Sequence, residues 1–312
     1  MLDEVQRLPS LLNYVHKLIE ENRLLFALTG SSARKLKKEN ANMLAGRALS
    51  MSFHPLSVIE LGGRFDLKDS LRFGHLPMVF SSDDPKQYLK SYVGTYLREE
   101  VQQEALVRNL VGFSQFMEVM ALSQGQLINT EKIGAEVGVD RKTIENYLKI
   151  LEDLLLAKRV PVFQKKAKRK MTTKPKFFYF DVGVYQILRP RGPLDLESEI
   201  HGVALETLIF QELVALIAQE GLDLAISFYR TTQHVEVDFV AYGEDGFFAI
   251  ESKMSPRIRP EDLVGLKQFH EDYPKAKCFL FYLGTERRLI DKFIHAVPIT
   301  SALKNLRDLI SS

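Results

Sequence analysis

The sequence has 312 residues, of which 46% are hydrophobic and 26% are charged, which is ordinary for a globular protein of two or three domains. Its net charge of +2 gives no overall field that selects a nucleic acid or a membrane, so any basic partner surface must be local. The single cysteine, Cys278, excludes an intramolecular disulfide and a Cys-rich zinc site. No apolar run approaches the ~18 residues of a membrane helix and no signal-peptide pattern is present, so we expect a cytoplasmic protein without a membrane partner.

Residues 1–60 have the pattern of part of an α/β domain. Apolar residues at helical spacing, from Leu11 to Leu18, predict an amphipathic helix. The continuous apolar run at 23–32 predicts a buried parallel strand, and residues 44–57 predict another strand followed by a turn.

The stretch LDEVQRLP, which begins at residue 2, places two carboxylates directly after an apolar residue. In P-loop ATPases an Asp at the end of a strand holds Mg²⁺, and a following Glu polarises the attacking water. Asp3 and Glu4 are the right residue types in that order. Thr29 or Ser31 in LTGSS is a candidate polar sensor of the γ-phosphate, and Arg47 in LAGR is a candidate positive charge for a nucleotide.

Together with ALTGSSARKL, LAGRALSMSFHPLSVIEL and YLKSYVGTYLREEV, this stretch resembles a widespread family of bacterial and archaeal AAA+ superfamily ATPases. Members of that family carry a domain of unknown function in their C-terminal half, and the resemblance covers nearly the whole chain. The family also has a P-loop, G-x-x-x-x-G-K-[ST], upstream of LDEVQRLP, and this sequence contains no such string. Because the P-loop cradles the phosphates, we expect no ATP binding by this chain.

The alternative for Asp3 and Glu4 is a solvated pair near a chain end. An AAA+ sheet without its P-loop strand and helix would also leave apolar surface bare at the Leu11 helix and at LLFALTG. We therefore expect self-association, or packing of these residues against the C-terminal part.

Residues 84–181 are predicted to be helical and to end in a winged helix-turn-helix. Asp84 is the expected N-cap of the first helix, with Pro85 at its first position. Within 126–181, Thr130 and Asp140 are the expected caps of a short and a longer helix, and two β-like runs then flank a basic tip.

This motif predicts a nucleic-acid interface. The longer helix carries polar residues opposite its apolar stripe, and no acidic residue occurs between Leu154 and Phe180, where nine Lys and Arg residues lie. The expected contacts, all polar or basic, are Arg141, Lys142, Asn146, Lys149, Lys165, Lys166, Lys168, Arg169 and Lys170. The alternative is a protein-interaction module with a solvated charged face, but charge and motif coincide, so we expect DNA as a partner.

The segment EVDFVAYGEDGFFAIESK has the spacing D-x12-E-x-K, formed by Asp238, Glu251 and Lys253. Glu251 and Lys253 lie on one face of a strand because side chains alternate, and a tight hairpin brings Asp238 beside them. Two carboxylates can bind Mg²⁺, and the lysine can orient or activate a water for attack on a phosphodiester. Glu206, on an apolar helix face upstream, needs a partner that this site would supply.

This arrangement resembles the PD-(D/E)-x-K nuclease superfamily. The resemblance implies Glu206, Asp238, Glu251 and Lys253 as catalytic residues, with Asp238 and Glu251 as the metal ligands. The alternative is a salt-bridged cluster of the same residues with a structural role, which would have the same sequence pattern.

The sequence thus predicts a multidomain α/β protein in three parts: a partial AAA+ core at 1–60, a helical region with a winged helix at 61–181, and a nuclease-like α/β domain at 182–312. We expect a nucleic-acid-binding protein of the AAA+ ATPase family that does not hydrolyse ATP. The alternative is a Mg²⁺-dependent DNA nuclease that uses the D-x12-E-x-K site.

Overall fold

The computed structural model of the chain describes residues 1–5, 8, 10–30, 48–49, 51–96, 101 and 109–311. Ser31 and Arg47 lie outside these residues. The strand expected within 44–57 lies partly outside them as well, and the described residues of that range form no strand.

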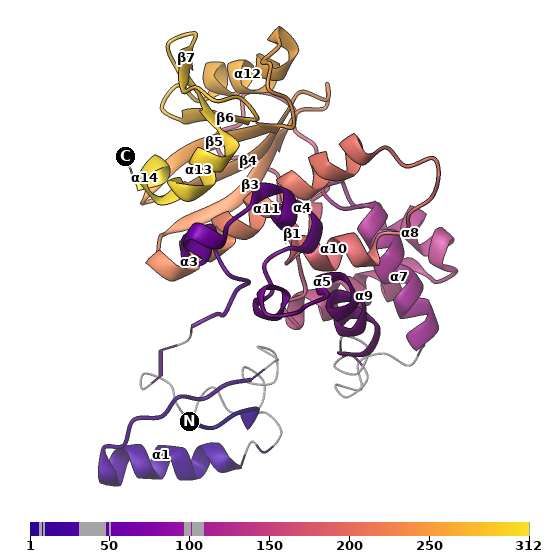
Figure 1. Cartoon of the computed structure of the whole chain (residues 1–312), viewed down its shortest axis with the longest axis vertical. Helices are drawn as coiled ribbons and strands as arrows, with labels where there is room; N and C mark the ends of the chain where they lie inside the picture. The colour runs from indigo at the N-terminus through magenta and orange to yellow at the C-terminus, as the bar shows by residue number, and fades with distance from the viewer. Residues whose placement is uncertain are drawn as a thin grey trace.

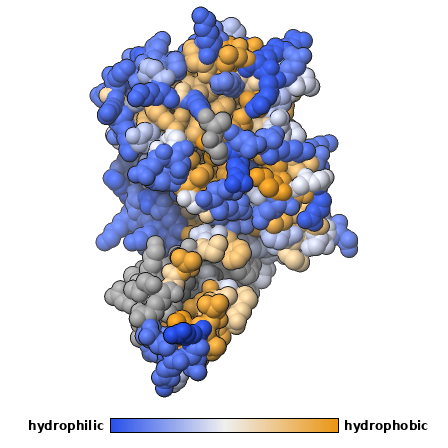
Figure 2. All heavy atoms as spheres, turned by 90° about the vertical axis from the view of Figure 1, so that its left-hand side faces the viewer, coloured by the Kyte–Doolittle hydropathy of each residue, from blue (hydrophilic) through white to orange (hydrophobic). Residues whose placement is uncertain are grey.

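The N-terminal segment contains helix α1 (Leu11–Asn22), as predicted, and lies apart from the main body in Figure 1. Leu2 and Leu28 form an isolated parallel bridge. The buried strand predicted at 23–32 is wrong, because Leu24 is 48% exposed and Leu25 is fully exposed. Among the described residues, only the stretch from Leu2 to Val5 pairs with it, and within it Phe26 and Leu28 are half-buried. Figure 2 shows hydrophobic side chains gathered on this lower part of the molecule.

The middle of the chain is helical. Asp84 accepts a hydrogen bond from the Gln87 N–H and Pro85 follows it, as predicted, whereas the N-cap predicted at Thr130 is wrong because Asn129 takes that position. Asp140 caps its helix as predicted. The elements are α3 (Val58–Leu61), η2 (Gly62–Arg64), α4 (Leu67–Phe73), η3 (Pro77–Phe80), α5 (Pro85–Ser91), the π-helix η4 (Tyr92–Tyr96), α7 (Leu110–Leu122), α8 (Thr130–Val137), α9 (Arg141–Asp153) and α10 (Val182–Leu188).

Two short strands, β1 (Ala157–Val160) and β2 (Lys176–Tyr179), pair in antiparallel fashion after α9. The residues that connect them, 161–175, form a strap along the edge of the C-terminal sheet. Val162 bridges Phe228 and Met171 bridges Thr231. The strap is therefore docked on the C-terminal part, whereas the sequence predicted a basic tip for phosphate contact. The identification as a winged helix stays a prediction.

The C-terminal part is built on a six-stranded mixed sheet in the order β3-β4-β5-β6-β8-β7. The β5–β6 and β6–β8 pairs are parallel, and the other neighbours are antiparallel. The elements are α11 (Glu197–Glu220), β3 (Leu224–Arg230), β4 (Glu236–Gly243), β5 (Gly246–Lys253), η5 (Pro260–Leu263), α12 (Val264–Asp272), β6 (Lys277–Tyr282), β7 (Arg288–Ile290), β8 (Ile294–Pro298), α13 (Ile299–Lys304) and α14 (Leu306–Ser311).

The two faces of this sheet belong to different hydrophobic clusters. One face packs against α11, α13 and α14 in a large cluster that runs from Val58 to Ile310, and the other packs against α12 and strap residue Phe163 (Figure 1). The large cluster contains residues from both sides of the predicted boundaries at 60/61 and 181/182. The helical middle and the C-terminal part therefore share one core. The predicted division into three parts stays a prediction.

Helix α11 is long and apolar enough to cross a membrane, contrary to the expectation that no such run exists. In the most apolar 18-residue stretch of this helix, 67% is buried inside the fold, and residues such as Leu208 and Leu213 are fully buried. Burial of this kind is typical of the central helix of a globular core. A cytoplasmic location stays a prediction.

Candidate functional site

The predicted D-x12-E-x-K residues meet where β4 and β5 lie side by side. Phe239 pairs with Ile250 in the antiparallel ladder, so Asp238 and Glu251 are the next residues outward on adjacent strands. The Asp238 N–H donates to Glu251 Oε2 at 3.2 Å. Asp238 Oδ2 in turn accepts from the N–H and the hydroxyl of Ser252, at 2.8 and 2.9 Å. Both carboxylates are buried.

Lysine side chains complete this arrangement. Lys253 donates to Glu251 Oε1 at 2.6 Å, as expected for residues two apart on one strand. Lys176, from β2, is buried between Glu206 of α11, at 3.8 Å, and Glu236 of β4, with which it forms a close ion pair. We call Lys176, Glu206, Asp238, Glu251 and Lys253 the carboxylate–lysine cluster.

The electrostatics of the cluster are dominated by burial and by mutual repulsion of the acids. Burial, followed by the charge of Asp238, raises the pKa of Glu206 to about 8, and the same two causes raise the pKa of Glu251 to about 8. Burial acts to lower the pKa values of Lys176 and Lys253, but the neighbouring carboxylates outweigh it and raise both. Both lysines are therefore charged at neutral pH.

The oxygen atoms of Asp238 and Glu251 fit a cation that is held by two carboxylates. Among the described residues, no three His, Cys, Asp or Glu side chains are arranged to hold one metal ion. Mg²⁺, however, often takes one or two carboxylates and keeps several waters. Asp238 Oδ1 accepts no hydrogen bond from the described residues, and it lies beside Glu251, whose raised pKa a divalent charge would lower.

Solvent reaches the cluster through two of its members. The side chains of Glu206 and Lys253 are 25% and 35% exposed, whereas Asp238 and Glu251 lie behind them. Gly125 packs over the Glu206 side, since a Cβ there would lie 3.2 Å from Glu206 Oε2. Two cavities, of about 420 and 350 Å³, are lined by other residues and not by the cluster.

The predicted nucleic-acid contacts divide into two groups. On α9, the side chains of Arg141, Lys142, Asn146 and Lys149 are exposed, opposite buried Ile144. Within the described part of the chain, Arg141 is the one of these that has an ion pair, with Glu131 at 3.3 Å. The four side chains form the polar face of α9.

The basic residues of the strap are less available than their sequence implies. Arg169 binds Asp272 and Glu271, Lys168 donates to the Glu271 carbonyl, and Lys165 lies 4.2 Å from the Tyr242 ring centre. Arg169, Lys168 and Lys165 thus help to dock the strap, whereas Lys166 and Lys170 stay exposed.

The N-terminal candidates are only partly described. Thr29 Oγ1 donates to Asp3 and accepts from the Glu4 N–H at 3.3 Å, and the Thr29 N–H donates to the Leu2 carbonyl at 3.0 Å. Asp3 therefore lies next to a hydroxyl on the adjacent parallel stretch, as expected for a Walker B carboxylate beside a sensor. The Walker B assignment itself stays a prediction, and Ser31 and Arg47 cannot be placed against it.

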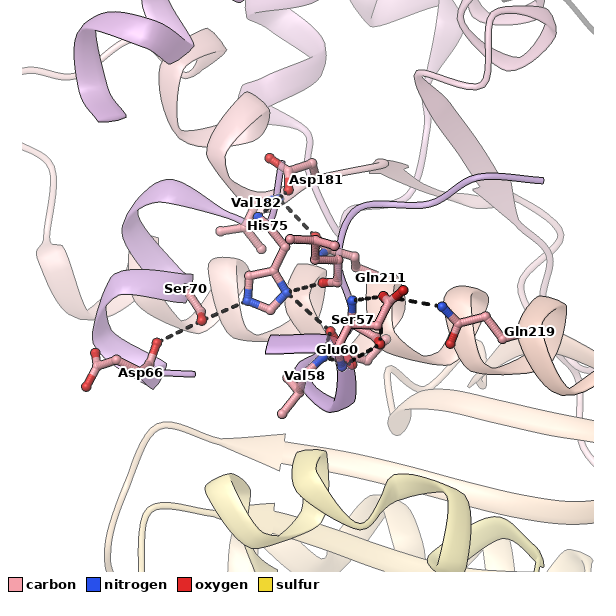
Figure 3. A network of polar contacts seen from close by, with 12 residues as sticks. Ser57, Val58, Glu60, Asp66, Ser70, His75, Asp181, Val182, Gln211 and Gln219 are labelled. Atoms are coloured by element: carbon pink, nitrogen blue, oxygen red, sulfur yellow. Dashed lines mark hydrogen bonds and ion pairs between the residues drawn. The ribbon is translucent and has the colours of Figure 1, made fainter. Parts of the chain in front are cut away.

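A second polar group, which the sequence did not reveal, is buried between the helical middle and α11 (Figure 3). His75 Nδ1 donates to the Leu56 carbonyl at 2.7 Å and lies 3.3 Å from Glu212 Oε1, while His75 Nε2 lies 2.8 Å from Ser70 Oγ. Glu212 also accepts from the Val58 N–H at 3.0 Å. We call these residues the His75 network.

The His75 network contains a serine, a histidine and a carboxylate in the order of a hydrolase triad, but its contacts are structural. Ser70 Oγ donates to the Asp66 carbonyl at 2.7 Å, so it accepts from His75, and all three side chains are buried. The network extends to Asp181, whose carboxylate accepts a hydrogen bond from the backbone N–H of His75 at 2.8 Å. Gly74 permits this contact, because a Cβ there would lie 2.4 Å from the Asp181 carboxylate.

Sequence reasoning missed Lys176 in the cluster and its partner Glu236, and it missed His75, Asp181 and Glu212 in the network. Lys176 is the first residue of β2 and follows a run of other basic residues, so no signal in the sequence marked it as buried. For Glu212, the available signal was a carboxylate flanked by apolar residues in the long helix α11.

Comparison with known families gives three consecutive matches. Residues 1–62 match an AAA domain, residues 64–195 a domain of unknown function (DUF8612), and residues 201–302 a second domain of unknown function (DUF4143). The first match supports an AAA-type domain at residues 1–62. The three matches do not test the nuclease-like or winged-helix assignments.

Two curated relatives are similar along most of the chain. An uncharacterized protein of Haemophilus influenzae is 22% identical over 88% of this chain and 70% of its own length. An uncharacterized protein of Methanocaldococcus jannaschii is 27% identical over 78% of this chain and 58% of its own length. A crystal structure of a Vibrio cholerae protein covers 73% of this chain and 56% of its own, at 14% identity, but its TM-score of 0.28 supports no argument.

Proposed function

We propose that the carboxylate–lysine cluster cleaves phosphodiester bonds of a nucleic acid with a bound divalent cation. The observation that carries this proposal is the meeting of two buried carboxylates on adjacent strands, Asp238 and Glu251, with the Lys253 ammonium 2.6 Å from Glu251. When bound, the cation would polarise a phosphoryl oxygen and lower the pKa of a bound water.

The chain's own groups would have separate tasks. Asp238 and Glu251 would hold the cation. Because the pKa of Lys253 is raised, its ammonium would stabilise charge on the phosphoryl oxygens and would not act as a base. The pKa of Glu206, at about 8, suits proton transfer near neutral pH, and its side chain reaches solvent.

The test is cleavage by the purified full chain. End-labelled single- and double-stranded DNA and RNA are incubated with Mg²⁺, Mn²⁺ or EDTA, beside the Asp238→Asn and Lys253→Met variants. We expect metal-dependent cleavage that falls at least ~100-fold in both variants. Lys267→Met is the control, because this exposed lysine pairs with Asp291 on the same domain. Absence of cleavage by the wild type, or equal cleavage by the variants, would refute the proposal.

The second candidate is nucleic-acid binding without cleavage, which the exposed polar face of α9 supports. In that case the ion pairs of the cluster stabilise the fold. Lys142→Glu with Lys149→Glu should weaken DNA binding and reduce the slope of log K against log salt by about 2. Lys267→Glu should leave both unchanged. If the double variant binds like the wild type, α9 is not the interface.

We also propose that this chain does not hydrolyse ATP, since its sequence contains no G-x-x-x-x-G-K-[ST] string. Phosphate release from Mg-ATP should not exceed that of a protein-free blank. Turnover that is lost in Glu4→Gln would overturn this.

A further inference from the structure

The larger of the two cavities, about 420 Å³ in volume, opens where β6, β8 and β7 lie side by side, next to α14 (Figure 1). Its basic lining residues are Lys277 at the start of β6, Arg287 just before β7, Arg288 on β7 and His295 on β8. None of the lining residues in the described part of the chain is acidic. Such a lining offers positive charge and hydrogen-bond donors, so it favours an anionic ligand.

The strand register places three of the basic residues on one face of the sheet. His295 pairs with Phe279 on one side and with Leu289 on the other, so these three residues form one row across β6, β8 and β7. Lys277 lies two residues before Phe279, and Arg287 lies two residues before Leu289, so alternation directs both toward the face of this row. Because β6 and β7 run in opposite directions, the two cations lie on opposite sides of the row.

The positive charges of this cavity are largely unbalanced. Within the described residues, neither the Lys277 ammonium nor the Arg287 guanidinium has a hydrogen bond or an ion pair, although Lys277 lies 6.0 Å from the Phe248 ring centre. Arg288 pairs with Glu286 at 3.0 Å, but both side chains are more than half exposed. Such an exposed pair is weak and can exchange its partner. The cavity therefore keeps accessible cations for a ligand.

An apolar surface separates the two cations. Its floor is made by Phe279, Val297 and Leu309, which are buried in the large hydrophobic cluster and are therefore held in place. Above this floor the Leu289 side chain is 60% exposed, and the exposed His295 ring lies 5.7 Å from the Phe279 ring. Cations on both sides of an apolar surface with an exposed ring suit a single nucleic-acid strand, whose bases have flat faces and whose phosphates are charged. A compact anion would leave the apolar surface uncovered.

We infer that this cavity binds a short stretch of single-stranded nucleic acid, with phosphates at Lys277 and Arg287 and a base between them on Leu289 and His295. The site is distinct from the carboxylate–lysine cluster. Lys253 pairs with Tyr282 at the end of β6, whereas Lys277 begins that strand, so the two sites lie at opposite ends of β6. The inference concerns binding alone and does not depend on the proposed cleavage.

The experiment is a fluorescence anisotropy titration of the full chain with fluorescein-labelled hexathymidylate, in EDTA so that no metal-dependent cleavage occurs. We expect saturable binding that weakens with salt. A phosphate contact on a single strand contributes about 0.7 to the slope of log K against log salt. Lys277→Met with Arg287→Met should therefore weaken binding at least ~10-fold and reduce the slope by about 1.4. Lys68→Met with Lys90→Met, an equal loss of charge at exposed positions of the helical middle, should change the affinity less than 2-fold.

Two further measurements test the seat of the base. Leu289→Ala alters an exposed side chain and should weaken binding at least ~3-fold without changing the salt slope. An abasic hexamer, which keeps the sugars and phosphates, should bind at least ~10-fold more weakly than hexathymidylate. Equal affinity for the two hexamers would overturn the placement of a base in the cavity.

The remaining outcomes decide whether the ligand is a nucleic-acid strand. Thymidine monophosphate and an octaglutamate peptide should each compete at least ~10-fold more weakly than unlabelled hexathymidylate. Equal competition by the nucleotide would assign the cavity to a free nucleotide, and equal competition by the peptide would assign it to any polyanion; either result would overturn the inference. No saturable binding by the wild type, or an unchanged Kd in the folded Lys277→Met, Arg287→Met variant, would overturn it as well. Because cleavage is measured separately, these failures would leave the proposed nuclease activity standing.

Discussion

Arg169 on the strap binds Asp272 at the end of α12, with Nε 3.0 Å from the carboxylate Oδ2. The same carboxylate oxygen accepts from the Tyr229 hydroxyl at 2.9 Å, and the Asp272 side chain is only 5% exposed. A buried carboxylate needs such partners to offset its lost hydration. This contact therefore explains why a strongly basic segment lies flat on the C-terminal part.

The first prediction concerns this contact. Arg169→Met should lower the urea midpoint of unfolding and speed hydrogen exchange of residues 161–175, because the Asp272 carboxylate would lose its cation. Lys166→Met, an exposed change on the same strap, should alter neither. If Arg169→Met leaves exchange of the strap unchanged, the ion pair does not hold it in place.

The second prediction concerns the His75 network. Glu212→Ala should reduce the free energy of unfolding by ~3 kcal/mol, because the Val58 N–H would lose its buried acceptor and His75 would lose the carboxylate beside its ring. Urea denaturation followed by circular dichroism measures this. Glu199→Ala, in the exposed first turn of the same helix, should change it by at most ~1 kcal/mol. Equal losses in the two variants would contradict a specific role for the network.

Features that depend on a short stretch of sequence, such as a hairpin or a helix cap, could be predicted. The hairpin turn between β4 and β5 and the two-residue strand period bring Asp238, Glu251 and Lys253 together, and both signals lie within 16 residues of sequence. The N-cap of α8 was predicted one residue late because Asn129 and Thr130 are both good caps.

What sequence could not provide was pairing between distant segments. Lys176 joins Glu206 from another element, and nothing in the basic run distinguishes it from exposed Lys170. The same holds for Arg169, whose acidic partner lies 103 residues away. Strands β7 and β8 also went unpredicted, because one is only three residues long and charged, and the other lacks alternation.

The third prediction concerns pH. The pKa of Glu206 is raised from 4.5 to about 8 in the folded chain, so the folded state holds a proton that the unfolded state releases. The contribution to stability is fully present below pH 4.5 and is lost as pH rises to about 8. The free energy of unfolding of Glu206→Gln should therefore fall less steeply over this window than that of the wild type.

Urea titrations at half-unit pH intervals measure this slope. Glu199→Gln, exposed on the same helix, should follow the wild-type curve. Parallel curves for Glu206→Gln and the wild type would mean that Glu206 does not titrate as its burial implies.

The last prediction concerns Cys278 on β6. Its side chain is fully buried, its Sγ lies 3.9 Å from the Ala276 carbonyl, and burial raises its pKa to about 12. The thiolate is the reactive form, so almost none is present at pH 8 and a thiol reagent must wait for the sheet to open. The native chain should react with Ellman's reagent only at the rate of global unfolding, and at once in guanidinium. In a Cys278→Ala background, Ser255→Cys, at a half-buried position just after β5, should react much faster than native Cys278. Rapid reaction of native Cys278 would show that the sheet opens locally at β6 without unfolding of the whole C-terminal part.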